Sequence, residues 1–188
     1  MKTDSKKWTV IKSKYLIQKP WLTARQDHVR LPNGNENEEY YVLEYPDWVN
    51  VIAITTNGDF VLIRQYRHGL GETRFEIPAG VIDPTDPNPE AAARRELLEE
   101  TGFTGGKWSL LTVLSGNAST TNNLCHCFIA EGVSQTDHQH LEATEDIDVV
   151  LFSREEVLKL LQKDEIKQSL MAAPLYKYFF LHHSESKP

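Results

Sequence analysis

The chain has 188 residues, which suits one domain or one domain with a small extension. It carries 27 acidic and 20 basic residues, and its net charge of −7 argues against nucleic acid as a partner. No apolar run approaches the roughly 20 residues of a membrane helix, and the first residues have no signal-peptide core, so we expect no membrane partner. The only cysteines, Cys125 and Cys127, would lie on one side of a strand, which is poor geometry for a disulfide. We therefore expect buried free thiols and a cytoplasmic protein.

Residues 8–44 contain runs that are rich in β-branched and aromatic side chains and are separated by turn signals. They predict an N-terminal antiparallel β extension over residues 1–46, ahead of a main domain over residues 47–188. Trp21 and Trp48 are candidates to stack on a purine, although such tryptophans are more often half-buried core residues.

The main domain begins with strand signals. Val49–Thr56 is an almost continuous apolar run, as in a central strand. A hairpin turn at Asn57-Gly58 leads to a partner strand at Phe60–Ile63. Arg74–Gly80 predicts another short strand.

The next segment predicts a helix with well-marked ends. Asn88 is a good N-cap, Pro89 suits the first helical position, and Glu90 favours the positive end of the helix dipole. Gly102 is placed to cap the C-terminus.

Three carboxylates share one face of this helix. On a wheel of about 100° per residue, Glu96, Glu99 and Glu100 fall within an arc of about 100°. Like charges at this spacing repel one another. A hard divalent cation would remove that cost, because Mg²⁺ prefers carboxylate oxygens and keeps waters for substrate phosphates. The alternative is a solvated acidic face braced by Arg94 and Arg95.

After the helix, Trp108–Leu114 and Leu124–Ala130 predict strands, with the polar loop Ser115–Asn123 between them. Glu131–Thr144 predicts a long polar loop of the kind that can serve as a lid. Ile147–Phe152 predicts the final strand.

Two helices are expected at the end of the chain. Ser153 caps the first, with Glu156 at the capping-box position. Ile166–Leu181 predicts the second, which is open to a break at Pro174.

The acidic helix and the glycine before it resemble the signature of the Nudix hydrolases. That pattern is a glycine, five residues, a glutamate, seven residues, and then REUxEExGU, in which U is aliphatic or aromatic. The matching positions are Gly80, Arg95-Glu96-Leu97, Glu99-Glu100 and Gly102-Phe103. Asp86 stands where the first glutamate should be, and eight residues separate it from Arg95. This departure leaves open whether Asp86 takes the place of the glutamate.

The segments RQYRHG and EIPAG, just ahead of this box, resemble the ADP-ribose pyrophosphatase branch of the family. The resemblance implies an α/β protein: a Nudix α/β/α sandwich with a mixed sheet, extended by the N-terminal β meander. Enzymes of this branch commonly dimerise through such strands, so the resemblance also implies a homodimer.

The resemblance further implies a site for Mg²⁺, or for Mn²⁺ in its place. Its ligands would be the backbone carbonyl of Ala79 and the carboxylates of Glu96 and Glu100, with Glu99 holding a further metal or its water. Arg67 and Glu76 would lie against the diphosphate of the substrate. Arginine matches phosphate geometry in a bidentate way, which supports this part on chemical grounds.

Three further assignments concern catalysis. The resemblance implies a catalytic glutamate in the loop before the last strand, which matches Glu145, with Glu142 as the alternative. Arg95 suits an ion pair that orients the box glutamates and so supports catalysis without touching substrate. His138 and His140, in the same long loop, are interpreted as ordinary loop residues.

The combined interpretation is Mg²⁺-dependent hydrolysis of ADP-ribose to AMP and ribose 5-phosphate. An alternative is another nucleotide sugar such as GDP-mannose, because Ser115–Asn123 lacks the proline that often follows the box in ADP-ribose enzymes. A second alternative is a non-catalytic sensor of ADP-ribose. A third is a structural role in an assembly, with the N-terminal strands as the interface.

Overall fold

The computed structural model describes residues 5–182, which fall into two compact units. The smaller unit combines the chain up to Pro46 with the loop Ser115–Asn123. The larger unit contains Asp47–Leu114 and the chain from Leu124 onward. None of the helices in the described part of the chain is long and apolar enough to cross a membrane.

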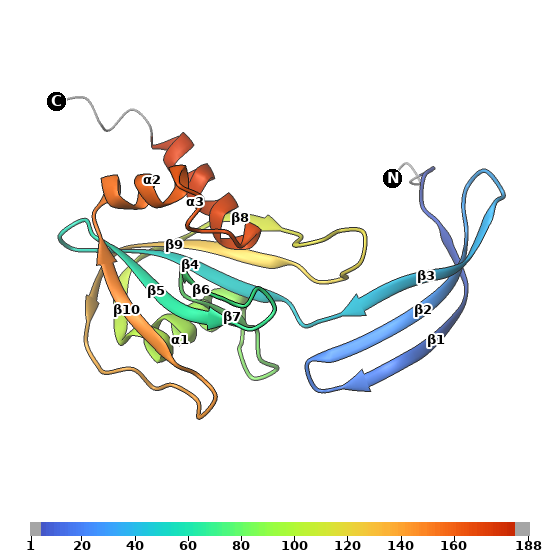
Figure 1. The fold of residues 1–188 in the computed structure, drawn as a ribbon, viewed down its shortest axis with the longest axis horizontal. Coiled ribbons are helices and arrows are strands. Elements are labelled where there is room, and N and C mark those ends of the chain that lie inside the picture. Colours follow the sequence, from blue (N-terminus) through green and yellow to red (C-terminus); the bar gives the residue numbers. More distant parts are fainter. Residues whose placement is uncertain (1–4, 183–188) are drawn as a thin grey trace. The chain divides into compact units, whose positions relative to one another are not determined.

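The smaller unit is an antiparallel sheet of strand order β1-β2-β3 (Figure 1). Its strands are β1 Thr9–Lys19, β2 Leu22–Arg30 and β3 Glu36–Glu44. Loop Ser115–Asn123 belongs to this unit because its backbone bonds to the end of β3: the Leu43 N–H donates to the Thr120 carbonyl at 2.7 Å. The β meander expected from the sequence is therefore confirmed.

The larger unit contains a mixed sheet of order β10-β5-β4-β9-β8, in which β6 also pairs with β5 and β7 with β4. Strands β4 and β9 are parallel, and the other pairs are antiparallel. The strands are β4 Trp48–Thr55, β5 Phe60–Arg67, β6 Glu72–Glu76, β7 Ala79–Val81, β8 Phe103–Leu114, β9 Cys125–Gln135 and β10 Ile147–Phe152.

Helices cover both faces of this sheet, and the alternation of the central strand explains why (Figure 1). Successive side chains of a strand point to opposite faces. On β4, the buried side chains of Val49, Val51 and Ala53 pack with α1, whereas Ile52 and Ile54 pack with α2 and α3. The helices are α1 Pro89–Thr101, α2 Arg154–Gln162 and α3 Ser169–Leu181. The predicted α/β/α sandwich with a mixed sheet is confirmed.

Two strand predictions need correction. The strand expected over Arg74–Gly80 is interrupted at Ile77-Pro78, because proline offers no N–H for a ladder. The loop expected over Glu131–Thr144 is also wrong at its start, since β9 continues to Gln135 and pairs with β8. Val133 in this extension is fully buried, so tertiary packing outweighs its polar neighbours.

The last helix begins at Ser169, later than expected, and it is not broken at Pro174. A proline inside a helix leaves the carbonyl four residues earlier without its usual donor. Here that carbonyl belongs to Leu170, and the buried Asn50 side chain donates to it at 2.7 Å. A hydrogen bond from β4 therefore replaces the bond that Pro174 removes from α3.

The capping box at the start of α2 is confirmed, with Ser153 and Glu156 bonding each other's backbone N–H groups. Cys125 and Cys127 are buried free thiols, as expected.

Candidate active site

Helix α1 has the ends that its sequence predicts. The Asn88 side chain accepts a hydrogen bond from the Ala91 N–H at 2.9 Å, and Pro89 is the first helical residue. Gly102 adopts the left-handed conformation at φ 75° and closes the helix by donating to the Leu98 carbonyl. These caps fix where the acidic face of the helix begins and ends.

The three glutamates of this face differ in exposure. Glu100 is buried, the side chain of Glu96 is 14% exposed, and that of Glu99 is 39% exposed. Gly80 lies directly against Glu96: a Cβ at position 80 would stand 2.1 Å from the Glu96 carboxyl carbon. The glycine is therefore required by the close approach of the β7 backbone to the acidic face.

Arg95 connects the acidic face to the loop before the helix. Its guanidinium donates to the carboxylates of Glu96 at 2.8 Å, Glu99 at 2.9 Å and Asp86 at 2.9 Å, and also to the Val81 carbonyl at 2.9 Å. The Asp86 carboxylate raises the pKa of Arg95 further, and the Arg95 guanidinium in turn lowers the pKa of Asp86. Asp86, which the box pattern left unresolved, thus forms the ion pair that anchors Arg95.

The environment of Glu96 and Glu100 disfavours negative charge. Burial raises the pKa of Glu96 to about 7, against the lowering effect of Arg95. Burial also raises the pKa of Glu100 well above its usual range, and the charges of Glu96 and Glu145 raise it further. A cation bound next to these two carboxyl groups would stabilise their charged forms.

The donor set of this face fits a hard divalent cation. Glu100 lies beside β7, where its Oε2 accepts a hydrogen bond from the Ala79 N–H at 2.9 Å. Carboxylate and carbonyl oxygens are the ligands that Mg²⁺ uses. Within residues 5–182 the oxygens of the three box glutamates do not converge within 4.8 Å as a set, and the Arg95 guanidinium bonds both Glu96 and Glu99. A cation would compete with Arg95 for the Glu96 carboxylate.

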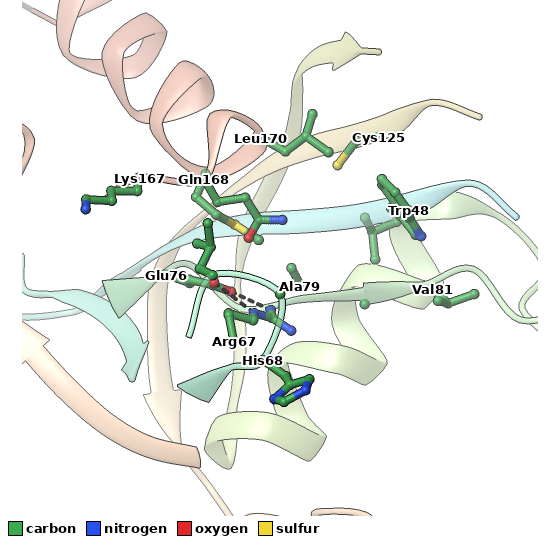
Figure 2. A pocket seen from close by; sticks show the side chains of 15 residues that line it. Trp48, Arg67, His68, Glu76, Ala79, Val81, Cys125, Lys167, Gln168 and Leu170 are labelled. Atoms are coloured by element: carbon green, nitrogen blue, oxygen red, sulfur yellow. Dashed lines mark hydrogen bonds and ion pairs between the residues drawn. The ribbon is translucent and has the colours of Figure 1, made fainter. Parts of the chain in front are cut away.

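A cavity of about 590 Å³ is lined by Ala79 and Gly80, which contact Glu100 and Glu96 of the acidic face, and an ion pair lies at its wall (Figure 2). Arg67 donates to Glu76 through Nε at 2.9 Å and through a terminal nitrogen at 2.5 Å. Glu76 is 2% exposed, whereas the Arg67 side chain is 39% exposed. This bond raises the pKa of Arg67, so the guanidinium is a fixed positive charge held in place by a buried carboxylate.

Other walls of the cavity come from distant parts of the chain (Figure 2). Trp48 of β4 and Cys125 of β9 lie along one side, together with Ala79 of β7. Another wall is the start of α3 and the residues just before it, namely Lys167, Gln168, Leu170 and Met171. Sequence reasoning missed this wall, because nothing in that segment resembles a binding motif.

Glu145 lies close enough to the acidic face for its charge to raise the pKa of both Glu96 and Glu100. Its carboxylate accepts a hydrogen bond from the Glu142 N–H at 2.8 Å, which closes the turn between the two residues.

Trp21 belongs to the smaller unit, at the β1–β2 turn, where it is 78% exposed with φ 64°.

Comparisons with known proteins agree with this architecture. Residues 45–173 match the NUDIX domain, and residues 8–43 match the nucleoside diphosphate sugar hydrolase N-terminal domain. The chain is 33% identical over 141 residues to the ADP-ribose pyrophosphatase of Bacillus subtilis (strain 168), a match that covers 74% of this chain and 75% of that protein. It is 29% identical over 160 residues to the methanol dehydrogenase activator of Bacillus methanolicus, covering 85% of each. A crystal structure of ADP compounds hydrolase has the same fold, with a TM-score of 0.83 over 97% of each chain at 20% identity.

Proposed function

We propose that this chain, which belongs to the Nudix family and is a pyrophosphohydrolase of nucleoside diphosphate sugars, hydrolyses ADP-ribose to AMP and ribose 5-phosphate with Mg²⁺ or Mn²⁺. The observation that carries the proposal is the position of the acidic face beside a cavity whose wall presents Arg67. A diphosphate needs cationic partners on both sides, and this arrangement offers a metal site on one side and a fixed guanidinium on the other.

The metal site would be formed by the Ala79 carbonyl, Glu96 and Glu100, with Glu99 holding a further ion or its water. A bound Mg²⁺ would neutralise the diphosphate oxygens and make phosphorus susceptible to attack by water. Arg95, held by its four acceptors, keeps the box carboxylates in position.

The remaining roles fall to residues around the cavity. The Arg67 guanidinium binds the diphosphate, and Glu76 fixes its orientation. Glu145 accepts the proton of the attacking water, a role that its proximity to the acidic face supports. Trp48, which lines the cavity, stacks on the base.

The test is a comparison of substrates with and without Mg²⁺. We expect ADP-ribose to give the highest kcat/KM among ADP-ribose, GDP-mannose, NADH and dGTP, and we expect a chelator to abolish turnover. Glu100→Gln keeps the shape of the side chain without its charge, so it should abolish turnover while the circular dichroism spectrum stays unchanged. Tight ADP-ribose binding without turnover of any compound would instead favour a sensor.

A second candidate substrate is another nucleotide sugar such as GDP-mannose. Loop Ser115–Asn123 has no proline, and the N-terminal match is to hydrolases of nucleoside diphosphate sugars in general. A kcat/KM for GDP-mannose above that for ADP-ribose would establish this alternative.

The proposal includes a homodimer in the cytoplasm. Strand β1 is exposed along its whole length, and apolar side chains such as Val10, Leu16 and Ile17 are each more than 40% exposed. A second copy of the chain would cover them. Light scattering should give twice the chain mass for the wild type, and Leu16→Glu should reduce the measured mass to that of the monomer.

The two free thiols support the cytoplasm as the compartment, because it is reducing.

A further inference from the structure

A cluster of potential metal ligands lies outside the site described above, in the loop between β9 and β10. One ligand atom from each of Asp137, His138 and His140 falls within 4.8 Å of the other two. The His138 Nδ1 atom is 2.7 Å from one Asp137 oxygen, and the His140 Nε2 atom is 3.0 Å from the other. The centroids of the two imidazole rings are 4.5 Å apart. Both rings therefore already face one carboxylate.

The loop is held in this conformation by the C-terminal end of α1. A helix end leaves carbonyls without intrahelical partners. The Asp137 N–H donates to the Gly102 carbonyl at 3.2 Å, and the His140 N–H donates to the Glu99 carbonyl at 2.8 Å. Gln139, between the two histidines, donates from its side chain to the Glu100 carbonyl at 2.7 Å. Gln139 therefore anchors the loop to α1, and the imidazoles of His138 and His140 on either side of it face solvent.

The packing of this loop is close as well as hydrogen-bonded. A Cβ on Gly102 would stand 2.2 Å from the Asp137 carbonyl oxygen. The glycine that caps α1 therefore also allows the loop to approach the helix this closely. A site built on such a fixed backbone needs only small side-chain rotations to bring three ligands to one ion.

We propose that Asp137, His138 and His140 form a binding site for one divalent transition-metal ion such as Zn²⁺, distinct from the Mg²⁺ site of the acidic face. Two imidazoles and a carboxylate are a donor set for Zn²⁺, whereas Mg²⁺ takes oxygen ligands. The three side chains are each more than 40% exposed, which leaves a coordination position open to water or another ligand. An ion here would cross-link the start of the loop that carries Glu145.

The donor atoms distinguish this site from the acidic face. Imidazole nitrogens suit Zn²⁺, whereas Mg²⁺ takes oxygen ligands. The acidic face offers no imidazole, so the histidine pair should make this loop prefer Zn²⁺ to Mg²⁺ more strongly than the acidic face does.

The test is Zn²⁺ titration by calorimetry on metal-stripped full-length protein in excess Mg²⁺, which occupies the oxygen site. We expect the wild type to bind one Zn²⁺ per chain, and His140→Gln and Asp137→Asn each to weaken binding by at least about 10-fold. His28→Gln, which removes a partly exposed imidazole paired with Glu36, is the matched control and should bind as the wild type does. Thermal melts without Zn²⁺ verify that each variant is folded.

Three results would overturn the proposal: no Zn²⁺ binding by the wild type, displacement of Zn²⁺ by Mg²⁺, or equal affinity in the folded His140→Gln and Asp137→Asn variants. Electron paramagnetic resonance with Cu²⁺ in place of Zn²⁺ provides an independent measurement. It should show nitrogen coupling in the wild type that is altered in His140→Gln.

Discussion

Gly80→Ala tests the geometry of the acidic face more directly than removal of a glutamate. An alanine Cβ at this position would be 2.1 Å from the Glu96 carboxyl carbon and one of its oxygens, and 2.3 Å from the other oxygen. Ordinary contacts begin near 3.4 Å, so the carboxylate must move by more than an ångström. The displaced group is the end of a flexible side chain, so the fold should tolerate the change.

The expected loss is in activity. A misplacement of about 1 Å at a catalytic group can cost about 10²-fold in rate, which corresponds to about 2.7 kcal/mol of transition-state stabilisation. We therefore expect kcat for ADP-ribose to fall by about 10²-fold in Gly80→Ala, while the melting temperature changes little. Steady-state release of AMP and circular dichroism melts measure the two quantities.

The matched control is the same change in a chain that lacks the obstructing carboxylate. In Glu96→Ala the added Cβ meets no carboxylate, so Gly80→Ala/Glu96→Ala should be no less active than Glu96→Ala alone. If Gly80→Ala lowers activity by the same factor in both backgrounds, steric displacement of Glu96 is not the cause and the reasoning is refuted.

Three further predictions follow from the same region. Asp86→Asn should lower kcat by about 10-fold without loss of fold, because Asp86 holds Arg95. Steady-state kinetics measure this, and the control Asp86→Glu, which keeps a carboxylate, should have activity near that of the wild type. The pKa of Glu96, about 7 in the folded state, exceeds its ordinary 4.5, so ionisation opposes folding. The metal-free wild type should therefore lose stability relative to Glu96→Gln as pH rises from about 4.5 to about 7; melts with EDTA check this, and a relative gain would contradict it. Leu97→Ala, at a fully buried position, should cost about 2–5 kcal/mol in urea unfolding, and a cost below 1 kcal/mol would show that the α1 core contact is unimportant.

The parts of the fold that the sequence could predict are those decided by local chemistry. Asn88, Pro89 and Gly102 each act on the backbone next to them, and the structure has the helix ends that they indicate. The continuous apolar run at Val49–Thr56 likewise requires burial on both faces, and β4 lies between the two helical layers. Such signals need no knowledge of distant residues.

Other features depend on partners far away in the chain. Pro174 argues for a broken helix only if the Leu170 carbonyl has no other donor, and its donor, Asn50, is 120 residues away. The extension of β9 to Gln135 depends similarly on its pairing with β8.

The candidate site shows the same division. The acidic face was predictable because Glu96, Glu99 and Glu100 share one helix. The wall formed by Lys167 and Gln168 was not, because only the path of the chain brings the start of α3 to the cavity.

The departure from the box pattern also has a physical resolution. The box pattern places a glutamate where this chain has Asp86, and it has one residue fewer before Arg95. The additional length lies in the loop, and Asp86 meets Arg95 at 2.9 Å with the shorter side chain. Asp86 also accepts a hydrogen bond from the Asp83 N–H at 2.9 Å, so the loop itself supports the carboxylate. Spacing in a loop can therefore vary where spacing along α1 cannot, because each residue added to a helix turns its side chains by about 100°.

Helix α1 is held at its middle and at its C-terminal end by contacts that do not depend on its own hydrogen bonds. Asp86 and the Val81 carbonyl fix Arg95 in the middle of the helix, and beyond its last turn the loop at Asp137 and His140 binds the terminal carbonyls. Its acidic face cannot supply this rigidity, because burial and the neighbouring carboxylates disfavour the charged forms of Glu96 and Glu100. These two sets of contacts thus keep in place an arrangement that is unfavourable by itself, which is what a preorganised cation site requires.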